Sequence, residues 1–158
     1  MEKITSFTID HIRLQPGLYV SRKDAVGSET VTTFDLRLTS PNEEPVMNTA
    51  EVHTIEHLGA TFLRNHPEYK DKTIYFGPMG CRTGFYLLLR DAVSRAEALG
   101  LVRDSMRFIA DFSGEIPGSR RWECGNYREH DLAAAKAVAE DMLDVLKDWN
   151  EEKMQYEA

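Results

Sequence analysis

Alternation of apolar and polar residues marks the segments of this chain that are expected to be strands. Four segments combine this alternation with β-branched and aromatic residues: residues 18–25, 30–38, 72–76 and 84–90. In the second segment, Phe34 and Leu36 fall on one face, while Asp35 and Arg37 fall on the other. A Gly-Ser turn joins the first two segments, and a loop with two glycines and a proline joins the last two. The pattern therefore predicts two pairs of strands.

Apolar residues that recur every three or four positions predict three helices, over residues 48–65, 92–112 and 131–149. Asn48 and Glu51 match a capping box at the start of the first helix, and Asp131 is the expected N-cap of the third. Residues 1–14 are expected to be extended, and residues 113–122 irregular. The order of strand pair, helix, strand pair and two helices predicts an α+β fold, in which helices cover an antiparallel β-sheet.

Length and composition limit the class of protein further. Residues 1–158 are enough for a single domain with a sizeable core. The net charge of -7 argues against a nucleic acid or an acidic membrane surface as the main partner. No apolar run approaches the ~20 residues of a membrane span, and the first residues do not resemble a secretory signal. We therefore expect a cytoplasmic protein, in which Cys81 and Cys124 form no structural disulfide.

The most informative segment is His53-Thr54-Ile55-Glu56-His57, inside the first predicted helix. At about 100° per residue, positions i, i+3 and i+4 fall within one arc of the helix, so His53, Glu56 and His57 lie on the same side. Two imidazoles one turn apart can bind a single divalent metal, with the carboxylate held beside it. The alternative is two exposed histidines on an ordinary amphipathic helix.

The third ligand decides which class of metal site this would be. The H-x-x-E-H order is the signature of inverted-zincin metallopeptidases, whose third ligand is usually a carboxylate farther along the chain. Cys124 is favoured here, because a thiolate beside Gly125 and just before a helix N-terminus is stabilised. Two histidines and one cysteine leave a fourth position open, as in catalytic sites. His130 is the rival third ligand, and a structural zinc site with four ligands, completed by His130 or Cys81, is the non-enzymatic alternative.

Cys81 lies in the segment Pro78-Met79-Gly80-Cys81-Arg82-Thr83-Gly84, which predicts a tight loop after a strand. A neighbouring cation such as Arg82 favours the thiolate form, which can act as a base or a nucleophile. Taken alone, the loop is equally compatible with a buried core cysteine.

These two segments and a third, Cys124-Gly125-Asn126-Tyr127, together resemble the S-ribosylhomocysteine lyase (LuxS) family of autoinducer-2 synthesis. The resemblance includes Ser6-Phe7, Asp10-His11, Arg37 and residues 41–57, and it extends over essentially the whole chain. It implies an α+β homodimer with its active sites at the subunit interface, acting on a small molecule.

The resemblance also assigns roles to individual residues. One divalent metal per subunit is implied, natively Fe²⁺, which Zn²⁺ or Co²⁺ can replace. By the family pattern, its ligands are His53, His57 and Cys124, the acid/base residues are Glu56 and Cys81, and the substrate-holding residues are Ser6, His11 and Arg37.

The implied reaction cleaves S-ribosyl-L-homocysteine to L-homocysteine and 4,5-dihydroxy-2,3-pentanedione. The carbon–sulfur bond is unactivated until a carbonyl group lies two carbons away, so two aldose–ketose isomerisations must precede β-elimination. A metal acts as the Lewis acid in such steps, and a thiolate and a carboxylate can shuttle the protons. This chain has Tyr75-Phe76-Gly77 where many members have Asp-Ile-Ser, so no substrate contact is assigned to Tyr75.

Overall fold

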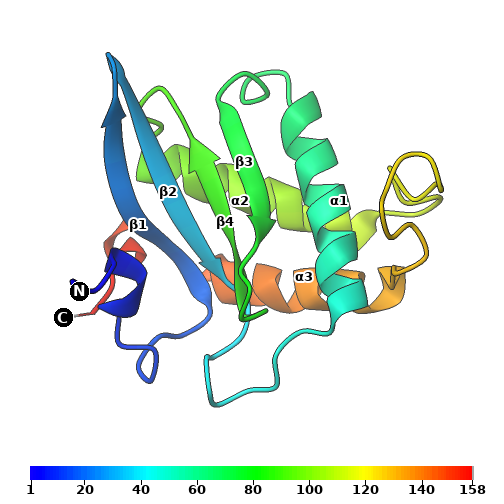
Figure 1. Cartoon of the computed structure of the whole chain (residues 1–158), viewed down its shortest axis with the longest axis horizontal. Coiled ribbons are helices and arrows are strands. Elements are labelled where there is room, and N and C mark those ends of the chain that lie inside the picture. Colours follow the sequence, from blue (N-terminus) through cyan, green and yellow to red (C-terminus); the bar gives the residue numbers. More distant parts are fainter. Residues whose placement is uncertain (158) are drawn as a thin grey trace.

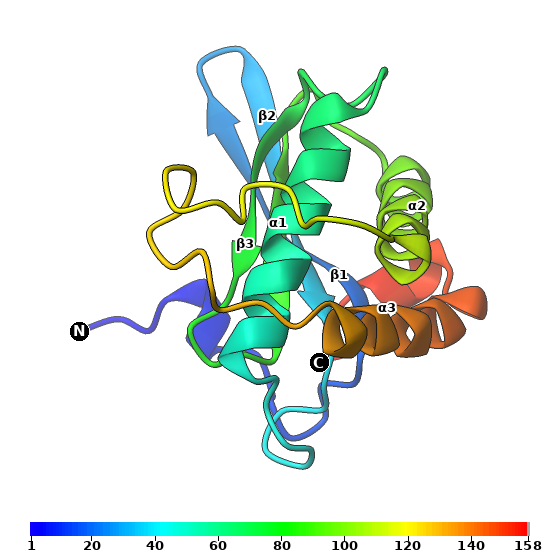
Figure 2. The ribbon, with the colours of Figure 1, turned by 90° about the vertical axis from the view of Figure 1, so that its right-hand side faces the viewer.

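Four antiparallel strands form one sheet with the order β1-β2-β4-β3. The computed structural model describes residues 1–157, and its strands are β1 (Gly17–Val26), β2 (Glu29–Arg37), β3 (Thr73–Pro78) and β4 (Gly84–Leu89). Three helices lie on one side of the sheet (Figures 1 and 2): α1 (Thr49–Asn65), α2 (Arg95–Asp111) and α3 (Leu132–Lys147). The predicted α+β fold, with an antiparallel sheet covered by helices in one domain, is confirmed.

Pairing between the strands aligns the apolar residues that face the helices. Leu36 of β2 lies opposite Leu18 of β1 and Phe85 of β4, and Phe34 lies opposite Leu87. All five side chains are essentially inaccessible to water. Burial of such side chains on a continuous face is the main favourable term in folding. The predicted alternation in β2 therefore places the core on the helix-covered face.

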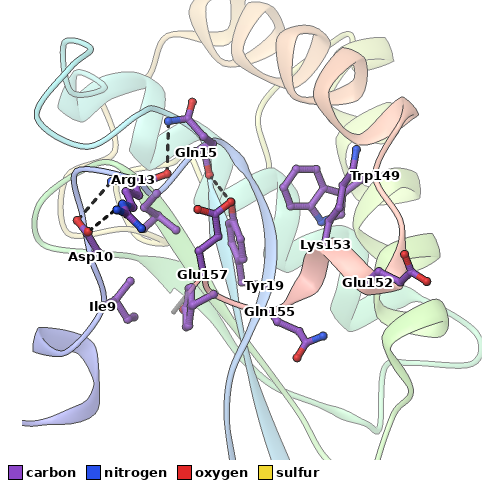
Figure 3. Close-up of a pocket in the computed structure, with 12 residues that line it drawn as sticks. Ile9, Asp10, Arg13, Gln15, Tyr19, Trp149, Glu152, Lys153, Gln155 and Glu157 are labelled. Atoms are coloured by element: carbon purple, nitrogen blue, oxygen red, sulfur yellow. Dashed lines mark hydrogen bonds and ion pairs between the residues drawn. The ribbon is translucent and has the colours of Figure 1, made fainter.

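The polar side of β2 is buried as well, because both chain termini fold over the β1 end of the sheet. Asp35 and Arg37 are 0% and 2% exposed. The C-terminal segment includes the short 3-10 helix η2 (Glu151–Met154), and it packs against residues near the N-terminus around a pocket of about 420 Å³ (Figure 3). In this pocket the Tyr19 hydroxyl donates to the Gln15 carbonyl at 2.8 Å.

Most predicted boundaries differ from the structure by one or two residues, and the differences at the N-terminus and in two helices have a physical reason or change an element. Residues 1–14 are not all extended, because they contain the 3-10 helix η1 (Thr5–Phe7) and a turn that ends at Leu14. Helix α2 begins at Arg95 rather than at residue 92, since Ser94 forms a capping box with Glu97 and the two residues at 91–92 are left-handed. Helix α3 ends at Lys147, two residues before the predicted end. Among residues 1–157, no helix is long and apolar enough to cross a membrane.

Candidate metal centre and substrate pocket

Helix α1 presents the three polar residues of the H-x-x-E-H segment. It starts at a full capping box, in which the Asn48 side chain accepts from the Glu51 amide and the Glu51 carboxylate accepts from the Asn48 amide. From this fixed start, His53, Glu56 and His57 are half-buried, whereas Val52, Ile55 and Leu58 of the same helix are buried in the core. The helix therefore holds the two imidazoles one turn apart at the edge of its buried face.

Backbone carbonyls orient both imidazole rings. His53 Nδ1 lies 2.8 Å from the carbonyl oxygen of Glu129, and His57 Nδ1 lies 2.8 Å from that of Pro117. Because a carbonyl can only accept, each Nδ1 must carry the hydrogen. The lone pair of each neutral ring is then on Nε2. Such hydrogen bonds fix the ring tautomer of histidines that bind metals.

Cys124 completes a group of three ligand atoms. Its Sγ lies 3.4 Å from His53 Nε2 and 3.8 Å from His57 Nε2. His53, His57 and Cys124 could hold a metal ion, since their ligand atoms all lie within 4.8 Å of one another. The amide of Asn126 donates to the same sulfur at 3.4 Å. The structure thus brings together the predicted pair on α1 and a cysteine from the irregular segment between α2 and α3.

The spacing of these atoms fits a tetrahedral metal. Bonds of about 2.1 Å to nitrogen and about 2.3 Å to sulfur would place neighbouring ligand atoms roughly 3.4–3.6 Å apart, close to the 3.4 and 3.8 Å between the sulfur and the two nitrogens. Two imidazoles and a thiolate suit zinc, iron or cobalt rather than magnesium or calcium. Within residues 1–157 no carboxylate and no fourth residue joins the group. The peptidase and structural-zinc alternatives are therefore not supported.

His130, the rival ligand, packs behind the group instead. Its ring stacks on His53 with 4.2 Å between centroids. The Thr54 hydroxyl donates to the Ala50 carbonyl, so His130 Nδ1, 3.0 Å from Thr54 Oγ1, must donate to it. Burial, followed by the charges of His53 and His57, lowers the pKa of His130 to about 4. His130 is therefore neutral near pH 7 and supports the ring of His53.

A separate pocket of about 530 Å³ contains four of the other predicted site residues. Its lining includes Ser6, His11, Arg37 and Cys81, which come from four different segments. None of the metal-binding group, nor Glu56, lines this pocket. The structure thus divides the predicted site residues of one chain into two sets.

Arg37 forms a buried ion pair at the base of this pocket. Its guanidinium donates to both oxygens of Asp35, at 3.1 and 2.7 Å, and to Thr83 Oγ1 at 2.8 Å. Burial alone would lower the pKa of Arg37, but the hydrogen bonds and charge of Asp35, with the nearby Cys81, raise it. The substrate-holding role of Arg37 stays a prediction, and its pairing with Asp35 and Thr83 was not anticipated.

Cys81 lies at the tip of the β3–β4 loop and is exposed, so the buried-core alternative is wrong. Arg82, its neighbour in sequence, donates instead to the Met47 carbonyl. The side chain in contact with the sulfur is Thr83, whose Oγ1 lies 3.1 Å from Cys81 Sγ. Sequence reasoning missed Thr83, because residue spacing does not show which side chains meet in a tight loop with a left-handed residue, here Arg82.

Together, these features define the class: an α+β protein with a two-histidine, one-cysteine group that could hold a metal ion. The sequence model of the family S-Ribosylhomocysteinase (LuxS) matches residues 4–153. The S-ribosylhomocysteine lyase of Clostridium acetobutylicum is 57% identical over 156 residues, covering 99% of both chains. Those of Finegoldia magna and Borreliella afzelii are 53% and 48% identical over 99% of both chains. The chain belongs to the LuxS family.

Proposed function

We propose that this protein is a metal-dependent carbon–sulfur lyase that converts S-ribosyl-L-homocysteine into L-homocysteine and 4,5-dihydroxy-2,3-pentanedione. The proposal rests on one observation: in a chain of the LuxS family, the ligand atoms of His53, His57 and Cys124 lie close enough together to hold a metal ion. The relatives described above are named for this activity, and each aligns with this chain over 99% of its length.

The reaction needs proton transfer at carbon before the sulfur can leave. Two aldose–ketose isomerisations move the sugar carbonyl from C1 to C3, which makes the proton on C4 acidic. Loss of that proton and of the C5–sulfur bond then releases homocysteine. A bound divalent metal would supply Lewis-acid polarisation of the sugar oxygens. This sequence of steps consumes no oxidant or reductant.

We propose that two residues of the chain move these protons. Glu56 lies on α1 between the two imidazoles in sequence and on their side of the helix, where its carboxylate can take and return protons on sugar oxygens. Cys81 lines the pocket as an exposed thiol, and its thiolate can take a proton from one sugar carbon and return it to the next. Ser6, His11 and Arg37 line the same pocket and are proposed to hold the substrate.

We infer that the active unit is a homodimer with two shared sites. In one chain, Cys81 and the substrate-holding residues line a pocket that the metal-binding group does not reach. A second copy could place its metal centre over this pocket. Two large apolar side chains support this arrangement, because Phe7 lines the pocket and is 69% exposed, while Trp122, near Cys124, is 79% exposed. Aromatic side chains are enriched in the surfaces through which proteins associate.

The proposal also includes the native metal, ferrous iron, and the compartment, the cytosol. A two-nitrogen, one-sulfur donor set is compatible with ferrous iron as well as zinc or cobalt, and we propose Fe²⁺ as the native metal. Ferrous iron next to a thiolate and an exposed Cys81 both require a reducing compartment. A small-molecule substrate, rather than a nucleic acid or a membrane, is the proposed partner.

A free-thiol assay tests the activity directly. The metal-loaded protein is incubated with S-ribosyl-L-homocysteine, and the homocysteine released is measured with a thiol reagent. We expect one thiol per substrate consumed, with no release by protein from which the metal has been removed. Release of no thiol by fully metal-loaded protein would refute the proposed function.

Mixed dimers test the shared site. His57→Ala damages the metal centre and Cys81→Ala damages the pocket, so each variant alone should be inactive. If each site uses one chain's metal and the other chain's pocket, a mixed dimer has one site with both defects and one intact site. With random pairing, half the dimers are mixed and half their sites work, so about a quarter of parent activity should return. Mixed dimers that form, shown by tagged co-purification, but stay inactive would contradict the shared site.

A further inference from the structure

A continuous chain of hydrogen bonds connects a buried ion pair to the sulfur of Cys81. Arg37 donates to both carboxylate oxygens of Asp35 and, through Nη1, to Thr83 Oγ1 at 2.8 Å. Thr83 Oγ1 in turn lies 3.1 Å from Cys81 Sγ. The ion pair belongs to β2, whereas Thr83 and Cys81 belong to the loop before β4.

The chemistry of these groups fixes the direction of the first link and, for an ionised sulfur, of the second. A guanidinium has donors only, so Thr83 Oγ1 must accept from Arg37. The hydroxyl hydrogen of Thr83 then stays free, and because a thiolate has no hydrogen to donate, Thr83 must be the donor whenever Cys81 Sγ is ionised. A donor aimed at sulfur favours the anionic thiolate over the neutral thiol. A hydroxyl that itself accepts from a cation is a stronger donor, because linked hydrogen bonds polarise one another.

We propose that Thr83 is a positioning residue for Cys81, whose hydroxyl holds the sulfur in the pocket as a thiolate by connecting it to the charge of Arg37. The inference rests on the proposed function, in which Cys81 acts as the base. What it adds is a role for Thr83 that depends on its hydroxyl.

The loop geometry explains why the adjacent cation cannot take this role. Arg82 is left-handed, with φ of 59°, and its side chain donates to the Met47 carbonyl at 3.2 Å. The amide of Met47 donates in turn to the Arg82 carbonyl at 3.1 Å. These contacts tie Arg82 to the segment before α1. They leave Thr83 as the side chain that bridges the sulfur and a cation.

The far end of the chain keeps Arg37 in place. Asp35 is 0% exposed, and its Oδ2 also accepts from the Tyr156 hydroxyl at 2.7 Å. Tyr156 stacks on Tyr19 of β1 with 5.2 Å between centroids. With both oxygens of Asp35 engaged, the guanidinium has one orientation, and its Nη1 points at Thr83. The oxygen of Thr83 is therefore held by Arg37 before any substrate binds.

The other titratable groups around Cys81 stay the same when only Thr83 is substituted, so they do not confuse a test of its hydroxyl. They are Asp35, Arg37, Arg82, Tyr86, His11 and Glu44, from β2, the loop, β4 and two segments that line the pocket. A substitution confined to Thr83 changes none of these charges. Thr83→Val removes the hydroxyl at nearly constant volume, and Thr83→Ser keeps the hydroxyl while removing the methyl group.

The test measures the rate at which iodoacetamide alkylates Cys81 as a function of pH, in the metal-loaded full chain. Peptide mass mapping separates Cys81 from Cys124. We expect Thr83→Val to move the midpoint of the rate profile upward by about one pH unit and to slow alkylation near pH 7 about tenfold, since one unit corresponds to a factor of ten. Thr83→Ser should stay within about twofold of the parent, and both variants should retain the metal.

A profile for Thr83→Val that superimposes on the parent would overturn the inference. An equal shift in Thr83→Ser would also overturn it, because the effect would then come from packing of the methyl group. If Thr83→Val does not fold, Thr83→Ala is judged by the same profile. The alkylation readout is independent of lyase activity, so a parent protein that releases homocysteine separates failure of this inference from failure of the proposed function.

Discussion

Loss of the Tyr156 hydroxyl should destabilise the protein, because that hydroxyl donates a hydrogen bond to the buried carboxylate of Asp35. Tyr156→Phe removes the donor to Asp35 Oδ2, a bond of 2.7 Å. It leaves the aromatic ring in place, so the stacking on Tyr19, with an interplanar angle of 19°, should persist. The effect of the substitution is therefore confined to the hydrogen bonds of this hydroxyl, with Asp35 and with Ser21.

The size of the effect follows from the burial and charge of the acceptor. Asp35 is 0% exposed, so water cannot replace the lost donor. Hydrogen bonds to charged groups contribute about 1.5–3 kcal/mol. Asp35 keeps two bonds from Arg37, which favours the lower half of that range. We expect Tyr156→Phe to reduce the free energy of unfolding by about 2 kcal/mol near pH 8.

The same substitution should change how stability depends on alkaline pH. Burial, and then the charge and hydrogen bond of Asp35, raise the pKa of Tyr156, and burial raises the pKa of Tyr19 to about 12. Above about pH 10 the unfolded chain releases these phenolic protons while the folded chain retains them. Stability is therefore present below pH 10 and is lost as the pH rises. Without its hydroxyl, residue 156 no longer contributes to this loss, so the deficit of Tyr156→Phe should shrink by about 1 kcal/mol from pH 10 to pH 11.

Urea unfolding followed by circular dichroism, at fixed metal and protein concentrations, measures both effects. Tyr75→Phe is the matched control, because Tyr75 is 48% exposed and its hydroxyl has no partner among residues 1–157. The control should change the free energy of unfolding by less than about 0.5 kcal/mol. Equal stability of Tyr156→Phe and the parent at pH 8, or a deficit that grows above pH 10, would refute the reasoning.

Three further predictions concern the metal centre and the proton-transfer residues. Loss of any one ligand, in His53→Ala, His57→Ala or Cys124→Ala, should remove most of the bound metal measured by plasma mass spectrometry, and Cys124→Ser with full metal and activity would contradict this. Glu56→Gln and Cys81→Ala should keep the metal but lower kcat by about 10²–10⁴-fold; a kcat within tenfold of the parent would exclude these roles. Gly118→Ala should weaken metal binding about 10–100-fold, because φ is +73° and the new Cβ would lie 2.9 Å from His57 Nδ1. Gly114→Ala, which has a positive φ but no neighbour within 4 Å, should bind metal like the parent.

Local periodicity predicted most of the secondary structure, because each signal lies within a few residues of the element it specifies. The capping box of α1 is one example, since Asn48 and Glu51 satisfy each other's backbone amides without help from the rest of the fold. The shared side of His53, Glu56 and His57 follows from helix geometry in the same way. The short helix η1 has no comparable pattern, because none of its residues is buried and its N-cap makes no side-chain hydrogen bond.

Contacts between distant segments were harder to predict. Asp35 and Arg37 alternate with core residues in β2, which is the usual pattern of a solvent-facing side. The structure buries them because the C-terminal segment covers that side, with Tyr156 bonded to Asp35 across 121 positions of sequence. Likewise, Arg82 is next to Cys81 in sequence, but the cation connected to the sulfur comes from β2 through Thr83. Proximity along the chain indicated a cation near the thiol but identified the wrong residue.

The segment between α2 and α3 shows why an irregular chain suits this metal centre. In a helix or a sheet the carbonyls of Pro117 and Glu129 would accept from backbone amides. In the irregular segment they instead accept from His57 and His53, at 2.8 Å each, and set the tautomer of both rings. These acceptors are main-chain atoms that every residue type carries, so side-chain pattern cannot identify them. The sequence can therefore indicate the ligands, while the groups that orient the ligands depend on the path of the backbone, and substitutions at residues 113–131 should be judged by their effect on that path.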